Sequence, residues 1–197
     1  MSNFLAIDTS SRYLTVLAQK GERVVLRHLP DCSMQHSVIL MGEIERALNE
    51  AELTPADCDF FAAVTGPGSF TGIRIGISTV KGLALGAGKP LLGLTSFELI
   101  AYNVKSENFC VCIDAAHSHC YAQGFKGFSL APSYLSFETV SSLGCKLYGF
   151  EDLPFENYTK IDVKNCLHPA ICSIEGKISG DISALYVRKS QAEEGRK

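Results

Sequence analysis

The sequence predicts an α/β protein of two lobes, of which the second is the smaller. Three observations support this fold class. Apolar strands alternate with amphipathic helices through the first hundred residues, as they do in α/β folds. A glycine-rich segment joins one buried strand to a long apolar helix. A strand, an aspartate, a turn and a returning strand occur twice, which indicates an internal duplication. We therefore expect a first lobe over residues 1–103 and a second over 104–197, whose last residues return to the first lobe.

The duplicated element is a β-hairpin. Residues 4–21, FLAIDTSSRYLTVLAQKG, form an apolar strand that ends in Asp8, a turn of small residues and a second strand with alternating apolar positions. Residues 111–127, VCIDAAHSHCYAQGFKG, repeat this pattern with Asp114 standing 106 positions after Asp8. The two aspartates either bind a ligand or accept hydrogen bonds from backbone N–H groups of their own turns.

The rest of the first lobe follows from apolar periodicity and capping residues. Its expected elements, in chain order, are an amphipathic helix over Ser37 to Glu52, a short helical turn opened by Thr54 and Pro55, a strand over Phe60 to Val64, a helix ending near Ala87, a strand over Leu91 to Leu94, and a helix from a capping box at Thr95 to about Asn103. Residues 129–169 mix short apolar runs with prolines, which predicts only scattered strands and helices. We expect Lys189 to Lys197 to fray.

The loop between the strand at Val64 and the following helix is rich in glycine, TGPGSFTGIRIG at residues 65–76. Its candidate ligand-binding residues are Gly66, Gly68 and Ser69, because a helix N-terminus attracts anions. Neither the Walker pattern nor G-x-G-x-x-G is present, however. The alternative is that these glycines serve backbone shape and close packing.

The helix after the loop also carries glycines inside it. Each interior glycine costs about 1 kcal/mol relative to alanine. Gly72, Gly76, Thr79 and Leu83 fall near one side, so another element must approach that side closely. The partner is either this chain's own sheet and helices or a second subunit.

Composition limits the function. The chain has 197 residues, 46% hydrophobic content and a net charge of −3. Such a charge gives no general attraction to nucleic acid, so any RNA contact requires a local basic patch or a partner. The N-terminus has neither a basic flank nor a long apolar segment. We therefore expect no signal peptide, no membrane span and a cytoplasmic location.

Eight cysteines occur without any C-x-x-C pair, which predicts reduced and mostly buried thiols. Cys110 and Cys112 would share one face of a strand, and His117, His119 and Cys120 follow closely. A zinc site there is the alternative. His36, just before the first helix, is expected to cap or pack.

Several segments together resemble the TsaB (YeaZ) family. They are the opening LAIDTSS, the helix beginning near His36, the block TGPGSFTGIRIGISTVKGLALG, the strand PLLGLTSFE and the terminal ALYVRKSQAE. The resemblance is strong over the first hundred residues and the last fifteen. It implies the two-lobed fold of the actin, hexokinase and Hsp70 (ASKHA, ribonuclease H-like) superfamily, with the second lobe shortened.

The resemblance also implies a function. TsaB-like proteins are non-catalytic paralogues of TsaD, which transfers a threonylcarbamoyl group onto the adenosine beside the tRNA anticodon. They pair with TsaD through the helices that are here Ser37 to Glu52 and Thr71 to Ala87. TsaE, a small ATPase, joins the pair, and TsaC supplies threonylcarbamoyl-adenylate. The expected interface residues are Leu40, Ile44, Leu48, Gly72, Gly76, Thr79 and Leu83.

From the same resemblance we expect no intrinsic cofactor, with ATP or ADP and metal on partner subunits. RNA would be met only within the complex, and the lone chain would form a homodimer. TsaD-like relatives carry two metal-binding histidines at positions that are here Ser96 and Ile100. Isoleucine offers no lone pair to a metal, so no catalytic or metal-binding residue is predicted.

Two enzyme classes of the same superfamily remain as alternatives. A small nucleotide-dependent kinase fits the fold but lacks glycine motifs in the second lobe, and a metallopeptidase lacks an H-E-x-x-H motif. The second hairpin also departs from the family, since Ala115, Ala116 and His117 follow Asp114 where relatives carry basic and acidic groups. Ala184 stands where a proline often precedes the tail.

Overall fold

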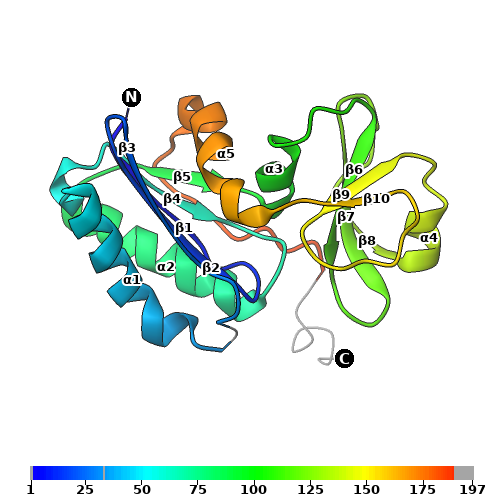
Figure 1. The fold of residues 1–197 in the computed structure, drawn as a ribbon, viewed down its shortest axis with the longest axis horizontal. Helices are drawn as coiled ribbons and strands as arrows, with labels where there is room; N and C mark the ends of the chain where they lie inside the picture. The colour runs from blue at the N-terminus through cyan, green and yellow to red at the C-terminus, as the bar shows by residue number, and fades with distance from the viewer. Residues whose placement is uncertain (1, 33, 189–197) are drawn as a thin grey trace.

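The computed structural model describes residues 2–32 and 34–188. Two five-stranded sheets lie side by side (Figure 1). The strands are β1 (Phe4–Asp8), β2 (Leu14–Lys20), β3 (Arg23–Leu29), β4 (Phe60–Val64) and β5 (Leu91–Leu94) in the first sheet, and β6 (Phe109–Asp114), β7 (His119–Phe125), β8 (Ser133–Ser136), β9 (Lys146–Gly149) and β10 (Tyr158–Lys160) in the second. The α-helices are α1 (His36–Ala51), α2 (Phe70–Ala87), α3 (Ser96–Ala101), α4 (Phe137–Ser141) and α5 (Leu167–Ile174).

The two sheets have the same topology. The first has the order β3-β2-β1-β4-β5, and the second, read from β8, has the order β8-β7-β6-β9-β10. In each, three antiparallel strands are followed by two parallel ones. The duplication predicted from the paired hairpins is therefore confirmed, and it extends to whole sheets.

The second lobe is smaller because its connections are short. In the first lobe the parallel crossovers run through α1, of 16 residues, and α2, of 18. In the second lobe the first crossover contains α4, of only 5 residues, and the path from β9 to β10 contains no helix. Its own crossovers therefore supply only loops and one short helix to cover the second sheet.

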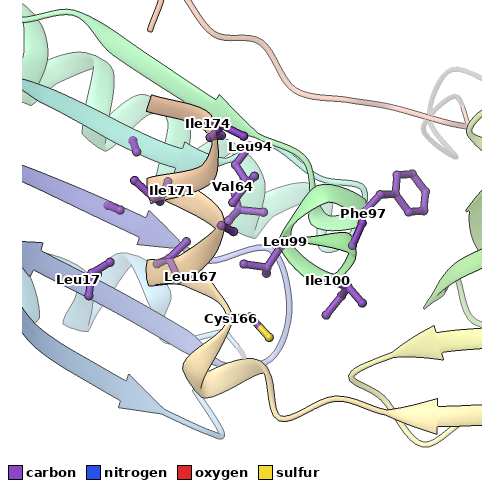
Figure 2. Packing of buried hydrophobic residues seen from close by; sticks show 14 of the residues in the cluster. Leu17, Val64, Leu94, Phe97, Leu99, Ile100, Cys166, Leu167, Ile171 and Ile174 are labelled. Atoms are coloured by element: carbon purple, nitrogen blue, oxygen red, sulfur yellow. The ribbon is translucent and has the colours of Figure 1, made fainter. Parts of the chain in front are cut away.

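Helices cover both faces of the first sheet (Figure 1). The helices α1 and α2 pack on one face through an apolar cluster that includes Leu5, Ile44 and Ile73. On the other face, α3 and α5 lie between the sheets and share a cluster with residues of both, including Leu94 and Val111. Figure 2 shows Leu167, Ile171 and Ile174 of α5 among these buried side chains. The two lobes thus share one central core.

The chain returns to the first lobe after β10. The short helix α5 packs there, although Pro169 stands in it; a proline in the first turn removes no helical hydrogen bond. Beyond α5, Ser179 forms an isolated bridge with Leu91. The Leu185 N–H then donates to the carbonyl of Thr65 at 2.8 Å. The fraying expected for Lys189 to Lys197 lies outside the described residues.

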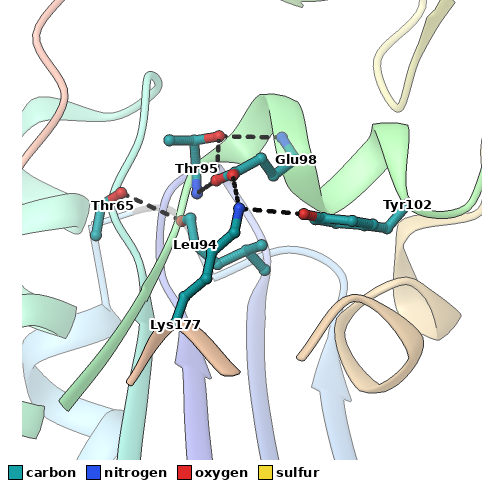
Figure 3. Close-up of polar contacts among 6 residues, drawn as sticks. All are labelled: Thr65, Leu94, Thr95, Glu98, Tyr102 and Lys177. Atoms are coloured by element: carbon teal, nitrogen blue, oxygen red, sulfur yellow. Dashed lines mark hydrogen bonds and ion pairs between the residues drawn. The ribbon is translucent and has the colours of Figure 1, made fainter. Parts of the chain in front are cut away.

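A polar cluster fastens this returning segment to α3 (Figure 3). Thr95 and Glu98 form the predicted capping box, in which Thr95 Oγ1 accepts from the Glu98 N–H at 3.0 Å and Glu98 Oε2 accepts from the Thr95 N–H at 2.9 Å. Lys177 contacts Glu98 Oε1 and the Tyr102 hydroxyl, each at 3.3 Å. The capping box therefore both starts α3 and holds the segment that follows α5.

None of the helices within residues 2–32 and 34–188 is long and apolar enough to cross a membrane.

Candidate functional site

Two regions are candidate functional sites: the cleft where the hairpin turns meet the glycine-rich loop, and the outer surface of α1 and α2. In the cleft, both hairpin aspartates bond to their own turns. Asp8 Oδ1 accepts from the Ser10 N–H at 2.8 Å, and Asp114 Oδ1 accepts from the Ala116 N–H at 3.0 Å. These equivalent bonds stand 106 residues apart, so the turn-forming role of the aspartates is duplicated with the fold.

The carboxyl groups of this cleft differ in environment. Asp8 is buried, and burial raises its pKa although it accepts hydrogen bonds from Ser10 and from the Tyr13 hydroxyl at 2.7 Å. Glu151 accepts from the Asp114 N–H at 2.8 Å. Burial raises the pKa of Glu151 to about 7. A carboxyl group that titrates near neutrality therefore lies between the lobes.

The glycine-rich loop is packed directly on the first hairpin turn. The Ser69 N–H donates to the Ser10 carbonyl at 2.6 Å, and Ser69 Oγ caps α2 by accepting from the Gly72 N–H at 3.2 Å. A Cβ on Gly68, whose φ is +155°, would lie 2.1 Å from the Ser10 carbonyl oxygen. Gly66 has a φ of +99°. Close packing thus explains Gly66, Gly68 and Ser69 without a bound anion.

A small cleft of about 280 Å³ opens beside this loop. Its lining brings Ser10, Arg12, His36 and Ser69 of the first lobe near Asp114 and Glu151. His36 is buried, and its Nε2 lies 3.0 Å from the Tyr13 carbonyl oxygen, so it packs as predicted. Throughout the described part of the chain, no three or more His, Cys, Asp or Glu side chains converge to hold a metal ion.

The cysteines and histidines of the second hairpin do not converge. Cys110, Cys112 and Cys120 are buried in the second-lobe core. The Cys110 side chain and burial raise the pKa of the Cys112 thiol, and burial raises the pKa of Cys120 to about 12. His119 instead stacks on Tyr134 with ring centroids 4.6 Å apart. The predicted burial of most cysteines is confirmed, since six of the eight are buried.

Ser96 and Ile100 lie inside the molecule. Both are fully buried, and Ile100 belongs to the central core. Ser96 donates its N–H to the Gly66 carbonyl at 2.7 Å, which fixes the start of α3 against the glycine-rich loop. Its hydroxyl has no hydrogen-bond partner among the described residues. These positions therefore serve packing here.

The small-residue side of α2 faces this chain's own sheet. A Cβ on Gly72 would lie 2.0 Å from the Thr9 carbonyl oxygen, and one on Gly76 would lie 2.5 Å from Thr9 Oγ1. Leu40 is also buried, with 1% exposure. Of the two partners left open by the sequence, the chain's own sheet is the one that contacts these glycines. In this conformation the first lobe itself covers Leu40, Gly72 and Gly76.

Three of the other expected interface residues, Ile44, Leu48 and Leu83, line a groove. Between α1 and the end of α2 lies a hollow of about 440 Å³. Its lining includes Met41, Ile44, Leu48, Leu53, Pro55 and Leu83. Ile44 and Leu48 form buried parts of this lining, whereas Thr79 and Leu83 are partly exposed. The groove floor is therefore apolar and open to solvent.

The most exposed apolar side chains lie on or just before α1 and on α2. Of these, Met41 lines the groove, whereas Met34 lines the cleft beside the glycine-rich loop. Val38 is 80% exposed, Met41 55% and Leu85 86%, and Met34 just before α1 is 97% exposed. An amphipathic helix normally turns such residues inward. The interface residues expected from the sequence include buried ones on both helices and two partly exposed ones, Thr79 and Leu83. The signal that sequence reasoning missed was the excess of apolar residues in α1 over what one buried stripe can use.

Comparisons with known proteins agree with this fold. Residues 30–143 match the family described as TsaD: tRNA N6-adenosine threonylcarbamoyltransferase. The tRNA threonylcarbamoyladenosine biosynthesis protein TsaB of Bacillus subtilis is 33% identical over 99 residues, covering 50% of this chain and 43% of that protein. Its Escherichia coli namesake is 33% identical over 112 residues, covering 57% of this chain and 48% of that protein. The chain spans about half the length of the curated relatives it matches.

Solved structures show the same two-lobed fold. YeaZ from Pseudomonas aeruginosa has a TM-score of 0.74 at 21% identity, covering 94% of this chain and 100% of that one. A second Pseudomonas aeruginosa structure, described as similar to peptidase YeaZ, has a TM-score of 0.76 at 21% identity and covers 95% of this chain and 100% of its own. At this identity the likeness establishes the fold alone.

Proposed function

This chain belongs to the TsaD family and to its TsaB (YeaZ) group, and on that basis we propose that it is a non-catalytic subunit in the formation of threonylcarbamoyladenosine on tRNA. In this proposal it pairs with a TsaD-like protein, which carries the transferase chemistry. A TsaE-like ATPase joins the pair, and a TsaC-like enzyme supplies threonylcarbamoyl-adenylate. ATP or ADP and metal belong to those partners, and tRNA is met within the complex, in the cytoplasm.

The exposed apolar surface of α1 and α2 is the observation that carries the proposal. Val38 and Met41 of α1 and Leu85 of α2 present apolar side chains to solvent, and Met41 continues into the groove that Ile44, Leu48 and Leu83 line. Contiguous exposed apolar surface marks a protein interaction site. Burying such side chains in an interface contributes roughly 25 cal/mol per Å² of apolar area. A TsaD-like partner would therefore bind over the groove and not against the glycines.

Two further features support a non-catalytic role. The positions at which TsaD-like relatives hold metal, Ser96 and Ile100, are buried and packed. The loop N–H group of Ser69 is already bonded to Ser10. A metal that activates water must be held by protein ligands. Within the described residues, no three or more His, Cys, Asp or Glu side chains are grouped to hold a metal ion.

The pairing is tested by charge placed at an exposed apolar position of each helix. We expect Val38→Glu and Leu85→Glu to abolish co-elution with the TsaD-like protein of the same organism, because each would bury an unpaired carboxylate in an apolar interface. Ile178→Glu is the matched control, since Ile178 is 40% exposed and lies outside both helices. If Val38→Glu and Leu85→Glu both co-elute with the TsaD-like protein at wild-type strength, the proposal that this surface binds the partner is wrong.

The same variants test self-association. A lone chain with an exposed apolar face is expected to form a homodimer through that face. Size-exclusion chromatography should then show Leu85→Glu as a monomer and Ile178→Glu as a dimer. A dimer that survives Leu85→Glu would place self-association elsewhere.

The reaction itself is tested by omission. Threonylcarbamoyladenosine on tRNA is measured with the TsaC-, TsaD- and TsaE-like proteins of the same organism, with and without this chain. We expect product only when the chain is present, and none from the chain with TsaC alone. Equal product without the chain would refute a role in this reaction.

A further inference from the structure

A strip of aromatic and cationic side chains crosses from the first lobe to the second along the returning tail. It consists of Phe70 and Arg74 of α2, Tyr186 and Arg188 of the tail, and His119 and Tyr134 of the second sheet. We propose that this strip binds an unpaired RNA strand, with bases stacking on its rings and guanidinium groups and phosphates paired with its arginines. The inference rests on the proposed function for the choice of RNA.

The first half of the strip is built on the start of α2. Arg74 lies over the Phe70 ring, with Cζ 3.8 Å from the ring centroid, and its Nε donates to the Tyr186 hydroxyl at 2.9 Å. The Phe70 and Tyr186 rings are 5.1 Å apart. Phe70 is 38% exposed and Tyr186 44% exposed. Two rings and a planar cation are thus held together at the surface, beside a shallow hollow of about 380 Å³.

The second half repeats this chemistry on the second lobe. His119 and Tyr134, from the neighbouring strands β7 and β8, stack with an interplanar angle of 4°. Arg188 lies over Tyr134, with Cζ 4.7 Å from the ring centroid, and donates from Nη1 to the Tyr134 hydroxyl at 2.9 Å. Tyr186 and Arg188 are two residues apart in the tail, so the two halves lie within roughly 7 Å along the chain. One short strand could span both.

The chemistry of the strip favours a nucleic acid. Single-stranded RNA is bound by aromatic rings and arginine planes that stack on bases and by cations that track the backbone. The strip combines both groups and contains no carboxylate. Among the described residues, no salt bridge involves Arg74. The whole chain carries a charge of −3, so a contact with RNA must be local, and this strip is such a place.

The strip differs from the surface proposed for the protein partner. That surface is aliphatic and includes a groove, whereas the strip pairs each ring system with a guanidinium group. Stacking on aromatic side chains accepts any base without sequence preference. We therefore expect binding that is sensitive to salt and indifferent to sequence.

The test is fluorescence anisotropy with the full chain and a labelled single-stranded RNA of about twelve mixed nucleotides, a length typical of such sites. We expect the single strand to bind more tightly than the same sequence as a duplex. Phe70→Ala, Tyr134→Ala and Arg74→Glu should each weaken binding at least about fivefold. Two variants outside the strip serve as controls: Tyr102→Ala removes an exposed aromatic side chain, and Arg23→Glu changes the net charge as Arg74→Glu does.

Several results would overturn the inference. One is a wild-type chain that binds the duplex as tightly as the single strand, or that binds neither. Another is a set of strip variants that bind RNA as tightly as the wild type. A third is a loss of RNA affinity in Arg23→Glu that equals the loss in Arg74→Glu. Strip variants that keep RNA binding but lose co-elution with the TsaE-like protein would assign the strip to a protein contact instead. Leu85→Glu separates the two proposals, because it should lose the TsaD-like partner while binding RNA at wild-type strength.

Discussion

Thr9, in the turn of the first hairpin, organises the start of the glycine-rich helix. Its Oγ1 donates to the Gly72 carbonyl at 2.7 Å, and its own carbonyl oxygen occupies the space where a Gly72 Cβ would stand. Its Oγ1 also fills the place of a Gly76 Cβ. Glycine is therefore required at these two positions because the hairpin turn at Thr9 lies so close to α2. The free-energy cost of a glycine inside a helix is offset here by the packing of α2 on the first lobe.

Gly72→Ala should destabilise the protein by about 1–3 kcal/mol, because the new Cβ forces backbone atoms apart. Gly82→Ala is the matched control in the same helix, since nothing lies within 4 Å of its Cβ position. That variant should gain about 0.5–1 kcal/mol from helix propensity alone. Urea unfolding of both variants measures the difference, and equal effects would contradict the packing described for Thr9.

Glu151 makes stability depend on pH. Its pKa in the folded protein is raised to about 7 from an ordinary value of 4.5, chiefly by burial. Between pH 4.5 and about 7, Glu151 is therefore protonated in the folded state and ionised in the unfolded state. The stability that this group contributes is fully present below pH 4.5 and is lost as pH rises through about 7.

We expect the free energy of unfolding to fall as pH rises from about 5 to 7, by at most about 1.4 kcal/mol per unit from this group. Glu151→Gln should flatten that dependence, because an amide keeps an acceptor for the Asp114 N–H but does not titrate. Urea midpoints at several pH values would show this. An unchanged slope in Glu151→Gln would exclude Glu151 as its source.

At the scale of elements, α3 depends on its first turn. The helix has only six residues, so tertiary contacts and its cap hold it. The Thr95 hydroxyl caps the helix by accepting a hydrogen bond from the Glu98 N–H (Figure 3). Lys177, from the segment beyond α5, contacts the Glu98 carboxylate. The cap is local, whereas the contact with Lys177 is an exposed ion pair.

Thr95→Ala should cost about 1 kcal/mol, the usual effect of losing a capping side chain. Lys177→Met should change stability by less than about 0.5 kcal/mol, because exposed ion pairs contribute little. Thermal unfolding of both variants distinguishes the two contributions. A larger loss for Lys177→Met than for Thr95→Ala would mean that the tail, and not the cap, determines α3.

At the scale of the whole molecule, α5 joins the lobes. Its apolar side chains belong to a cluster that includes strands of both sheets, so the lobes share a central core in addition to the cluster that each has of its own (Figure 2). We therefore expect a single cooperative unfolding transition.

Ile171→Ala should lower the stability of both lobes together, by about 2–5 kcal/mol, because it opens a cavity in the shared core. Hydrogen exchange would show amides of β1 and β6 losing protection by the same amount. Cys172→Ala, at an exposed neighbouring position, should leave both unchanged. Loss of protection confined to one sheet would indicate independent lobes.

The sequence by itself determined the paired hairpins, the alternation of strands and helices in the first lobe and the capping box at Thr95. These features can be predicted because strand periodicity, helix periodicity and capping residues each depend on only a few neighbouring residues. It also identified the family, through the specific block around residues 65–76. It did not locate α5, whose eight residues are too few for a clear period and contain Pro169.

Only the tertiary structure decided which face of each helix is free. From the sequence, Gly72, Gly76 and Leu40 are expected at an interface with a partner. The turn at Thr9 and the first lobe cover them, while Val38 and Leu85 are exposed to solvent. Periodicity tells which residues share a side of a helix, but not which neighbour covers that side. The aromatic strip is likewise invisible in sequence, because its members come from α2, two strands of the second sheet and the returning tail, and only folding brings them together.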